Sequence, residues 1–355
     1  MMTREQWLPW LEREGLDAVL LLHPVNRRYA AGFSSSAGAV LLCRQVGYFL
    51  TDFRYIEAAR QRIGQLEVLE VNAQRDYTGW FCKLLEQHQV KTLGFEENQL
   101  SFAEHQRLSQ KLSARLQPMG DGLAQMRRCK TPEEIAAIRR AQGIGEKALE
   151  ETLNFIRPGV TEQEIAARLT YEMLRRGAAQ MSFDPIVASG ANGSMPHAVP
   201  TDKPVQTGEM ITMDFGCVVD GYCSDMTRTV AVGAIGEEQE KIYQTVLQAQ
   251  LAGIAAARAG VTGAQVDGAA RQVIEQAGYG PCFGHSFGHG VGLEVHEAPN
   301  ASPSNQEPLR AGEVISAEPG IYVAGQCGVR IEDLLVIGED GCENLNTGTK
   351  ELIYL

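Results

Sequence analysis

The sequence of 355 residues lacks the features that mark several classes of protein. No apolar run approaches the roughly 20 residues that a helix needs to span a bilayer, so we expect no membrane contact. Acidic residues outnumber basic ones by 44 to 32, and the net charge of −12 makes nucleic acid a poor partner. The eight cysteines form no Cys-x-x-Cys pair, and the first residues are typical of a charged amphipathic helix rather than a signal peptide. We therefore expect reduced thiols and a cytoplasmic protein.

What is present indicates a folded protein of two domains. Apolar residues make up 44% and charged residues 21%, close to the average of globular proteins. The chain is too long for one ordinary domain of roughly 100–150 residues. Its first third alternates short buried strands with helices, a pattern typical of an α/β domain. Pro118 and the glycines of the segment 119–122 mark its end, so we place the domains at residues 1–123 and 124–355.

The second domain begins with a well-marked helix. Thr131 is a good N-cap, Pro132 suits the first helical position, and Glu133 and Glu134 lie in the first turn. Later segments show helical or strand periodicity and are not interleaved in regular alternation. Helices are predicted at 162–175, 238–258 and 263–277, and strands at 210–218, 222–232, 313–322 and 328–337. This grouping favours an α+β domain.

A predicted hairpin brings two aspartates onto one face. Asp220 and Gly221 are the pair favoured in a type I′ turn, and this turn sets Asp225 opposite Gly216. Asp214 then lies on the same face as Asp225, as its diagonal neighbour. Two carboxylates this close repel each other unless a positive group lies between them. A metal ion or an arginine would satisfy them, and a solvated hairpin face is the alternative.

Histidines gather in a glycine-rich segment. His285, His289 and His296 lie within one short stretch, and His197 precedes them by about a hundred residues. Glycine lets the backbone approach a ligand closely, and imidazole is a common metal ligand and proton carrier. A lone histidine is more often structural, but three in such a segment favour a functional site.

Two glutamates occupy polar positions in otherwise apolar strand patterns. Glu318 follows an apolar run and precedes Pro319, while Glu332 shares a strand pattern with Arg330. Strand alternation puts Arg330 and Glu332 on the same face. An ion pair between these two residues is the alternative to a ligand role for Glu332, and the two roles are compatible.

The charge of these candidates suits a dinuclear metal site. Four carboxylates carry a charge of −4, which two divalent ions would neutralise. Oxygen-rich ligation with a single imidazole suits Mn, Co, Fe or Zn better than it suits a thiolate-preferring metal. Two such ions about 3.5–4 Å apart can activate a water and polarise a substrate carbonyl.

The candidate ligands lie in five motifs that resemble those of a known family. The motifs are Asp-Phe-Gly at 214–216, Ser-Asp-Met-Thr-Arg-Thr at 224–229, Gly-His-Gly-Val-Gly at 288–292, Glu-Pro-Gly-Ile-Tyr at 318–322 and Val-Arg-Ile-Glu-Asp at 329–333. In order and spacing they resemble the creatinase/prolidase/methionine aminopeptidase family of pita-bread metallopeptidases. The segments 51–55 and 130–134 resemble its prolidase and aminopeptidase P branch. The resemblance implies an α+β pita-bread catalytic domain preceded by a smaller α/β domain of creatinase/prolidase type.

The resemblance also implies a role for each ligand. Asp214 would hold the first metal ion, His289 and Glu318 the second, and Asp225 and Glu332 would bridge both. Manganese is the metal we expect first, with Co, Zn or Fe as alternatives. In the resembling enzymes the reaction is hydrolysis of a bond to proline.

Further residues match catalytic positions of the family. Glu318 would take a proton from the attacking water. His197 and His296 would line the substrate site and stabilise the tetrahedral intermediate, and His285 would lie near the residue that follows the scissile bond. Arg330 would orient Glu332 or a bridging aspartate.

One departure bears on the substrate. Many prolidase-like relatives carry a basic residue shortly after His-Glu-x-Pro, where it meets the carboxylate of a dipeptide, but this sequence has Asn300. We therefore expect an Xaa-Pro aminopeptidase acting on proline-containing peptides, with an Xaa-Pro dipeptidase as the alternative. A non-catalytic pita-bread binding protein, a methionine aminopeptidase and a metal-free creatinase-like enzyme are further alternatives, which the intact ligand set and the first domain disfavour. The resemblance also suggests a homodimer.

Overall fold

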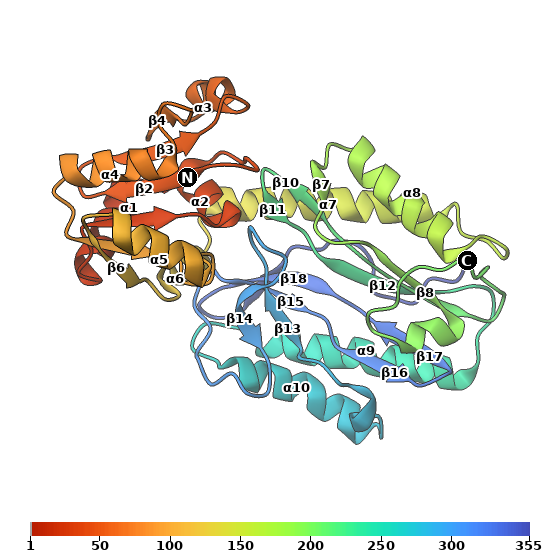
Figure 1. Cartoon of the computed structure of the whole chain (residues 1–355). Coiled ribbons are helices and arrows are strands. Elements are labelled where there is room, and N and C mark those ends of the chain that lie inside the picture. Colours follow the sequence, from red (N-terminus) through yellow and green to blue (C-terminus); the bar gives the residue numbers. More distant parts are fainter. Residues whose placement is uncertain (1) are drawn as a thin grey trace. The chain divides into compact units, whose positions relative to one another are not determined.

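The computed structural model describes residues 2–355, and the contacts within the chain divide it into two units, Met1–Leu123 and Ala124–Leu355. The first unit is α/β and the second is α+β, as predicted from the order of the elements (Figure 1). Each unit has its own sheets, and hydrophobic core clusters lie within each of them.

A six-stranded sheet with the order β4-β3-β2-β1-β5-β6 forms the centre of the first unit. Its strands are β1 (Ala18–Leu21), β2 (Ala39–Cys43), β3 (Gly47–Thr51), β4 (Glu67–Glu70), β5 (Thr92–Phe95) and β6 (Arg115–Pro118). The pairs β1–β2 and β2–β3 are antiparallel, and the outer pairs are parallel. Strands β1, β2 and β3 are buried along their whole length, which explains their continuous apolar runs.

Helices α1 (Arg4–Arg13), α2 (Pro24–Ala31), α3 (Ile56–Arg62), α4 (Tyr77–Gln87) and α5 (Phe102–Lys111) complete this unit. The sequence is a poor guide to two of these helices. The pattern of residues 101–115 predicts one continuous helix, but α5 ends at Lys111, because Leu112 is extended and Arg115 begins β6. Helix α2 was missed because its eight residues are too few to show a helical period.

In the second unit, α7 (Pro132–Leu153) and α8 (Glu162–Arg175) pack side by side. As predicted, Thr131 caps α7: its hydroxyl accepts a hydrogen bond from the Glu134 amide, and the Glu134 carboxylate accepts one from the Thr131 amide. These helices cover two small sheets, with orders β12-β9-β8 and β11-β10-β7. The strands are β7 (Gln180–Met181), β8 (Ile186–Ser189), β9 (Met210–Phe215), β10 (Cys217–Val219), β11 (Tyr222–Cys223) and β12 (Met226–Ala231). The short helix α6 (Gly122–Arg128) precedes α7.

The other half of this unit repeats the theme with α9 (Glu237–Ala256) and α10 (Gly263–Gln276), which also lie side by side (Figure 1). They pack against a sheet with the order β14-β13-β15-β18-β19 and a ribbon of β16 and β17. These strands are β13 (Gly288–Gly290), β14 (Glu297–Ala301), β15 (Val314–Ala317), β16 (Gly320–Val323), β17 (Cys327–Arg330), β18 (Asp333–Ile337) and β19 (Cys342–Asn344).

The predicted hairpin is confirmed. Asp220 and Gly221 have φ values of 49° and 83°, the left-handed pair that a type I′ turn requires, and Val219 pairs with Tyr222. The same register continues into β9 and β12, where Asp214 pairs with Thr227. The turn thus fixes which side chains of the two strands face each other.

Two long strands that we predicted are each broken in the structure. The segment 313–322 divides at Glu318 and Pro319 into β15, which pairs with β18, and β16, which pairs with β17. Proline cannot donate a ladder hydrogen bond, which explains the break. The segment 328–337 divides at Ile331 and Glu332. Each break leaves a glutamate outside the strands, Glu318 at the first and Glu332 at the second, and both side chains line the same cavity.

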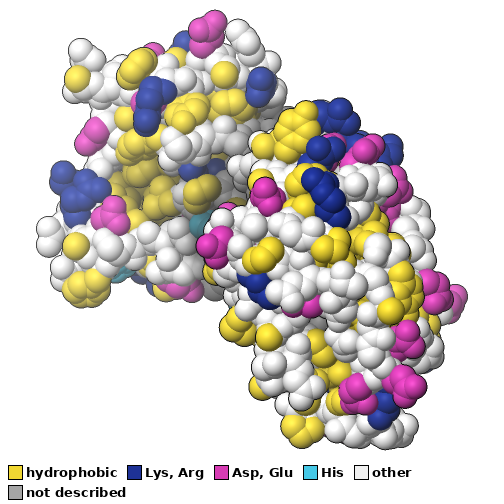
Figure 2. Space-filling model, turned by 90° about the vertical axis from the view of Figure 1, so that its right-hand side faces the viewer, with side chains coloured by type: hydrophobic (Ala, Val, Ile, Leu, Met, Phe, Trp, Pro, Cys, Tyr) yellow, Lys and Arg dark blue, Asp and Glu magenta, His cyan; other side chains and the backbone are white. Residues whose placement is uncertain are grey.

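The surface mixes charges of both signs. On the face shown in Figure 2, Lys and Arg side chains are interspersed with Asp and Glu side chains. Within residues 2–355, no helix is both long enough and apolar enough to cross a membrane.

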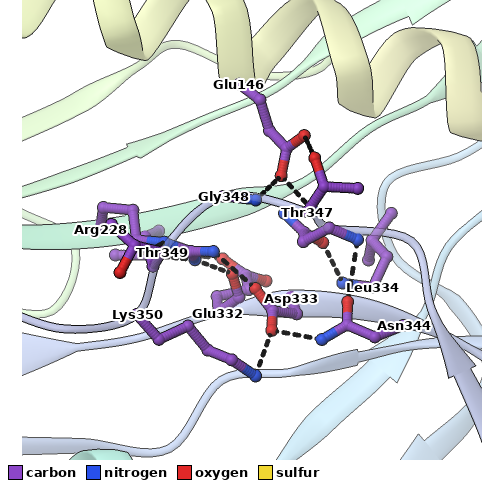
Figure 3. A network of polar contacts seen from close by, with 12 residues as sticks. Glu146, Arg228, Glu332, Asp333, Leu334, Asn344, Thr347, Gly348, Thr349 and Lys350 are labelled. Carbon is purple, nitrogen blue, oxygen red and sulfur yellow. Dashed lines mark hydrogen bonds and ion pairs between the residues drawn. The ribbon is translucent and has the colours of Figure 1, made fainter.

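A buried ion-pair network anchors β18 directly after Glu332 (Figure 3). The Asp333 carboxylate accepts hydrogen bonds from Arg228 Nη2 at 2.8 Å, Lys350 Nζ at 2.8 Å and Asn344 Nδ2 at 2.6 Å. Burial alone would raise the pKa of Asp333, but the charges of Arg228 and Lys350 outweigh it and hold that pKa below its usual value. Arg228 also donates to the Glu332 carbonyl at 2.6 Å, so the network fixes the backbone of a candidate ligand.

The same network ties the segment 344–350 to the rest of the unit. Arg228 Nε donates to the Thr349 carbonyl, and the Glu146 carboxylate on α7 accepts from the amides of Thr347 and Gly348 (Figure 3). Removing the Asp333 carboxylate would therefore leave Arg228 and Lys350 without their negative partner, at the point where β12, β18 and the segment 344–350 meet.

We expect Asp333→Asn to lower the free energy of unfolding by about 3–5 kcal/mol, because it leaves the buried Arg228 without its carboxylate partner. Thermal and urea unfolding measure the change. Asp340→Asn, an exposed carboxylate just past β18, is the control and should be close to neutral. Unfolding of Asp333→Asn at wild-type temperature and urea concentration would mean that backbone carbonyls alone satisfy Arg228.

Candidate functional site

All the site residues singled out from the sequence line one cavity of about 560 Å³ in the second unit. They are Asp214, Asp225, His289, Glu318, Glu332, His197, His285, His296 and Arg330. The remaining lining includes apolar side chains, among them Phe183, Ile186, Val199 and Val295. Residues from both halves of the unit thus meet at one concave surface, the arrangement expected of a binding or catalytic site.

Backbone pairing brings the five candidate ligands together. Asp214 lies on β9 and pairs with Thr227 on β12, just after Asp225. The Glu332 amide donates to the Thr227 carbonyl at 3.1 Å, which places Glu332 beside the same pair of strands. In the other half, the Glu318 amide donates to the Phe287 carbonyl at 2.8 Å, two residues before His289.

His289 connects the carboxylates of the two halves. Its Nε2 lies 3.1 Å from Glu318 Oε1 and 3.6 Å from Asp225 Oδ2. Its Nδ1 lies 3.1 Å from the Gly290 carbonyl oxygen, which can only accept, so Nδ1 carries a proton. When the ring is neutral, the lone pair on Nε2 is therefore free to bind a metal ion.

Glu332 is held by a relay through a threonine. Thr227 Oγ1 donates to Glu332 Oε2 at 2.7 Å and accepts from Arg330 Nε at 3.0 Å. The guanidinium forms its ion pair with Asp214, where Arg330 Nη2 donates to Oδ2 at 2.6 Å. Strand alternation suggested a direct pair between Arg330 and Glu332. In the structure the direct partner of Arg330 is Asp214, and Arg330 reaches Glu332 through Thr227.

Three of the four carboxyl groups have raised pKa values, because too little positive charge lies near them. Burial raises the pKa of Asp225 well above its usual value, and the charges of Glu332 and Asp214 raise it further. Burial, with repulsion from Glu318 and Asp214, does the same for Glu332. The pKa of Asp214 is also raised, because burial and repulsion from Glu318 outweigh the attraction of Arg330.

Glu318 and His289 shift each other in the opposite sense. Burial would raise the pKa of Glu318, but the hydrogen bond and charge of His289 outweigh it, and the pKa lies below its usual value. Burial would lower the pKa of His289, but Glu318 outweighs it, and the pKa lies above its usual value. A proton on this imidazole would partly offset the negative charge of the metal-free cluster.

This donor set fits divalent cations. One donor atom each of Asp225, His289 and Glu332 lies within 4.8 Å of the others. Asp214 Oδ1 is buried and has no hydrogen-bond partner among residues 2–355, as expected of an atom meant for a ligand. Oxygen donors with one imidazole suit Mn, Co, Fe or Zn.

The other three histidines surround this cluster. His285 Nε2 lies 3.0 Å from the Tyr322 hydroxyl, and burial lowers the pKa of His285. The ring of His296 meets that of His289 edge to face, with centroids 4.3 Å apart. Burial and the neighbouring charge of His289 lower the pKa of His296. His197 and His296 are exposed at the cavity, where a substrate can reach them.

Sequence reasoning missed three hydroxyl groups that hold the site. Thr227 forms the relay to Glu332, Tyr322 accepts from Arg330 Nη1 at 2.7 Å, and Ser316 Oγ donates to Glu318 Oε1 at 3.0 Å. Thr227 and Tyr322 lie within the five motifs, which was the available signal. Their partners come from distant segments, so no local pattern indicated the contacts.

Comparison with known proteins identifies the family. The sequence model of the family described as metallopeptidase family M24 matches residues 136–339. The sequence model of the creatinase/prolidase N-terminal domain matches residues 4–129. An Xaa-Pro dipeptidase of Pyrococcus furiosus is 35% identical over 356 residues, covering 98% of this chain and 99% of that protein.

Solved structures agree over nearly the whole chain. An Xaa-Pro dipeptidase from Bacillus anthracis superposes with a TM-score of 0.95 at 38% identity, covering 99% of both chains. An X-Pro aminopeptidase from Thermotoga maritima MSB8 superposes with a TM-score of 0.93 at 39% identity, covering 97% of this chain and 99% of that one. With both domains matched and the candidate ligands gathered in one cavity, the chain belongs to metallopeptidase family M24.

Proposed function

We propose that this metallopeptidase hydrolyses the peptide bond between an N-terminal residue and proline, as an Xaa-Pro aminopeptidase with two divalent ions. The observation that carries the proposal is the cluster of four carboxylates and one imidazole on the wall of a cavity large enough for a short peptide. The names of the relatives supply the proline specificity, and both aminopeptidases and dipeptidases occur among them.

The five donors would share the two ions as the family resemblance implies. Asp214 would bind the first ion, His289 and Glu318 the second, and Asp225 and Glu332 would bridge them. Manganese is the proposed metal, because oxygen-rich sites with one imidazole suit it. When bound, such ions lower the pKa of a water and polarise the scissile carbonyl.

Side chains around the cluster would perform the proton transfers and hold the substrate. Glu318, whose low pKa keeps it ionised, would accept the proton of the attacking water. His197 and His296 would donate hydrogen bonds to the carbonyl oxygen as it gains charge.

His285, oriented by the Tyr322 hydroxyl, would contact the residue that follows the scissile bond. Arg330 would hold Asp214 in place.

The cavity lining favours peptides longer than two residues. Asn300 lines the cavity, and the only Lys or Arg side chain among the residues that line it is Arg330, already paired with Asp214. A dipeptide would place its free carboxylate here without a cation of its own. The dipeptidase alternative requires a basic group from outside this lining.

The proposal includes a cytoplasmic homodimer. All eight cysteines are free thiols, which suits a reducing compartment. The resemblance to the prolidase branch suggests the homodimer, and light scattering at several protein concentrations tests it.

We expect Asp225→Asn and Glu332→Gln to abolish activity and weaken metal binding without unfolding the protein. The raised pKa of each carboxyl means that the folded, metal-free protein binds protons more tightly than the unfolded chain does. The contribution of these two groups to stability therefore falls as the pH rises above about 4. Manganese should raise the melting temperature of the wild type more at pH 7.5 than at pH about 5.5, and should raise that of the variants little.

Metal analysis and melts in EDTA or manganese check this prediction. At pH 7.5 without metal, Asp225→Asn should melt at or above the wild-type temperature, because a repelling charge is gone. Near wild-type activity with two bound ions in either variant would show that the ligand assignment is wrong.

We expect His296→Ala and His197→Ala to keep a normal metal content but to lower kcat by about 10²–10⁴-fold, the usual loss when a positioned donor or proton carrier is removed. Kinetics and metal analysis on the same preparations separate the two effects. His105→Ala on α5 is the control and should be silent. A loss of bound metal that parallels the loss of activity would show that these histidines are metal ligands.

We expect Xaa-Pro-Xaa tripeptides to be cleaved with a higher kcat/KM than Xaa-Pro dipeptides. The carboxylate of a dipeptide would be partly desolvated without a charged partner, whereas the tripeptide has a neutral amide there. Asn300→Arg should raise kcat/KM for the dipeptide selectively, and Asn300→Gln is its control. A wild-type preference for dipeptides would point to a dipeptidase with a basic clamp supplied from elsewhere.

A further inference from the structure

A buried carboxylate that is not part of the cavity lining accepts hydrogen bonds from the backbone and side chains of one loop. Glu162 is the first residue of α8, and its side chain is fully buried. Oε1 accepts from the Ser189 amide at 2.7 Å and the Ser189 hydroxyl at 2.8 Å. Oε2 accepts from the Thr201 amide at 3.0 Å and the Thr201 hydroxyl at 2.6 Å. Asn192 Nδ2 donates to both oxygens, at 3.1 and 3.2 Å.

These contacts close the neck of the loop formed by residues 189–201. Ser189 ends β8 and Thr201 lies at the other end of the loop, so one carboxylate joins both ends. Loops of this size with joined ends keep a compact shape. The loop carries His197, which lines the cavity.

The opposite side of the loop rests against β17, the strand that carries Arg330. A Cβ at Gly193 would lie 3.1 Å from the Gly328 amide nitrogen, so the two backbones are in close contact. Arg330 Nη1 donates to the Pro196 carbonyl at 3.4 Å, next to His197. The loop is therefore held at its neck by Glu162 and near its tip by the arginine that pairs with Asp214.

Within residues 2–355, Glu162 has no direct cationic partner for its charge. Lys203 Nζ donates to Ser189 Oγ at 2.8 Å but forms its ion pair with Glu209. Burial alone would raise the pKa of Glu162, but the hydrogen bonds from Thr201 and Ser189 outweigh it, and the pKa lies below its usual value. The carboxylate is thus stabilised by the loop donors themselves, so carboxylate and loop depend on each other.

We propose that Glu162 is a positioning residue for His197: by joining Ser189 to Thr201 it sets the loop geometry that points His197 at the substrate. This inference rests on the proposed function only in that His197 acts on the substrate. Among residues 2–355, the Glu162 side chain hydrogen-bonds to no residue that lines the cavity and to no candidate ligand, so its effect on catalysis passes through the loop.

Glu162→Gln is the central test, because an amide group would turn N–H donors toward the donors of the loop. We expect kcat for an Xaa-Pro-Xaa tripeptide to fall about 10- to 100-fold, the scale of loss from a small misplacement of a catalytic group. The manganese binding isotherm should stay unchanged. Glu164→Gln is the matched control: it makes the same change two residues along α8, on an exposed carboxylate that caps the helix through Thr161.

A double-mutant cycle separates positioning from general damage. In the His197→Ala background, Glu162→Gln should change kcat less than about 2-fold, because residues that act through each other are not additive. Thr201→Val removes a single donor and should give a smaller loss of the same kind if Glu162→Gln does not fold. Additive losses in the cycle, or a parallel loss of manganese affinity, would overturn the inference.

Hydrogen exchange on the metal-free protein tests the clamp without a substrate. Amides of residues 190–201 should exchange faster in Glu162→Gln than in the wild type and Glu164→Gln, while β9 and β12 keep wild-type rates. Unchanged exchange in this loop would overturn the inference. If the wild-type protein cleaves no Xaa-Pro peptide, yet the loop amides exchange faster in Glu162→Gln, the proposed function is wrong. The structural role of Glu162 in holding the loop is then still supported.

Discussion

Mutual repulsion among four carboxylates within one cavity is the constraint on which the rest of the catalytic unit depends. One guanidinium, that of Arg330, and one imidazole, that of His289, lie against them, and three of the four carboxyl groups still have raised pKa values. Folding alone does not neutralise this cluster. The surrounding polypeptide must hold the groups together against their repulsion, which divalent cations would relieve.

The two halves of the unit share this task unequally. The hairpin of β9 and β12 supplies Asp214 and Thr227, which pair with each other, and Asp225 lies just before β12. The half with α9 and α10 supplies His289, which lies between two glycines in β13, and Glu318, which lies between β15 and β16. Paired strands thus carry Asp214 and His289. The carboxylates of Asp225, Glu318 and Glu332 reach the cavity from backbone between strands.

Much of the fold could be predicted from local signals. Asp220 and Gly221 determined the hairpin, Thr131 determined the start of α7, and the order of the elements predicted an α/β unit followed by an α+β unit. The site residues came partly from charge counting and partly from motifs that resemble a family, and the structure brings all of them to one cavity.

What failed depended on tertiary contacts. Pro319 divides a continuous apolar pattern into two strands with different partners, which periodicity alone does not show. Arg330 pairs with Asp214, more than a hundred residues away in sequence, rather than with its strand neighbour Glu332. Glu162 looks like an ordinary first-turn helix residue in the sequence, and only the folded loop makes it a centre of hydrogen bonding.

The network around Asp333 also makes the site depend on a distant segment of the chain. Lys350, Thr347 and Gly348 follow all five candidate ligands along the chain, yet they complete the charge balance beneath Glu332 and dock onto α7. A nascent chain that has already exposed every ligand still lacks the cation and backbone amides that secure β18. The backbone under Glu332 is therefore secured only when the segment 344–350 has docked, so the geometry of the site depends on residues that are not themselves candidate ligands.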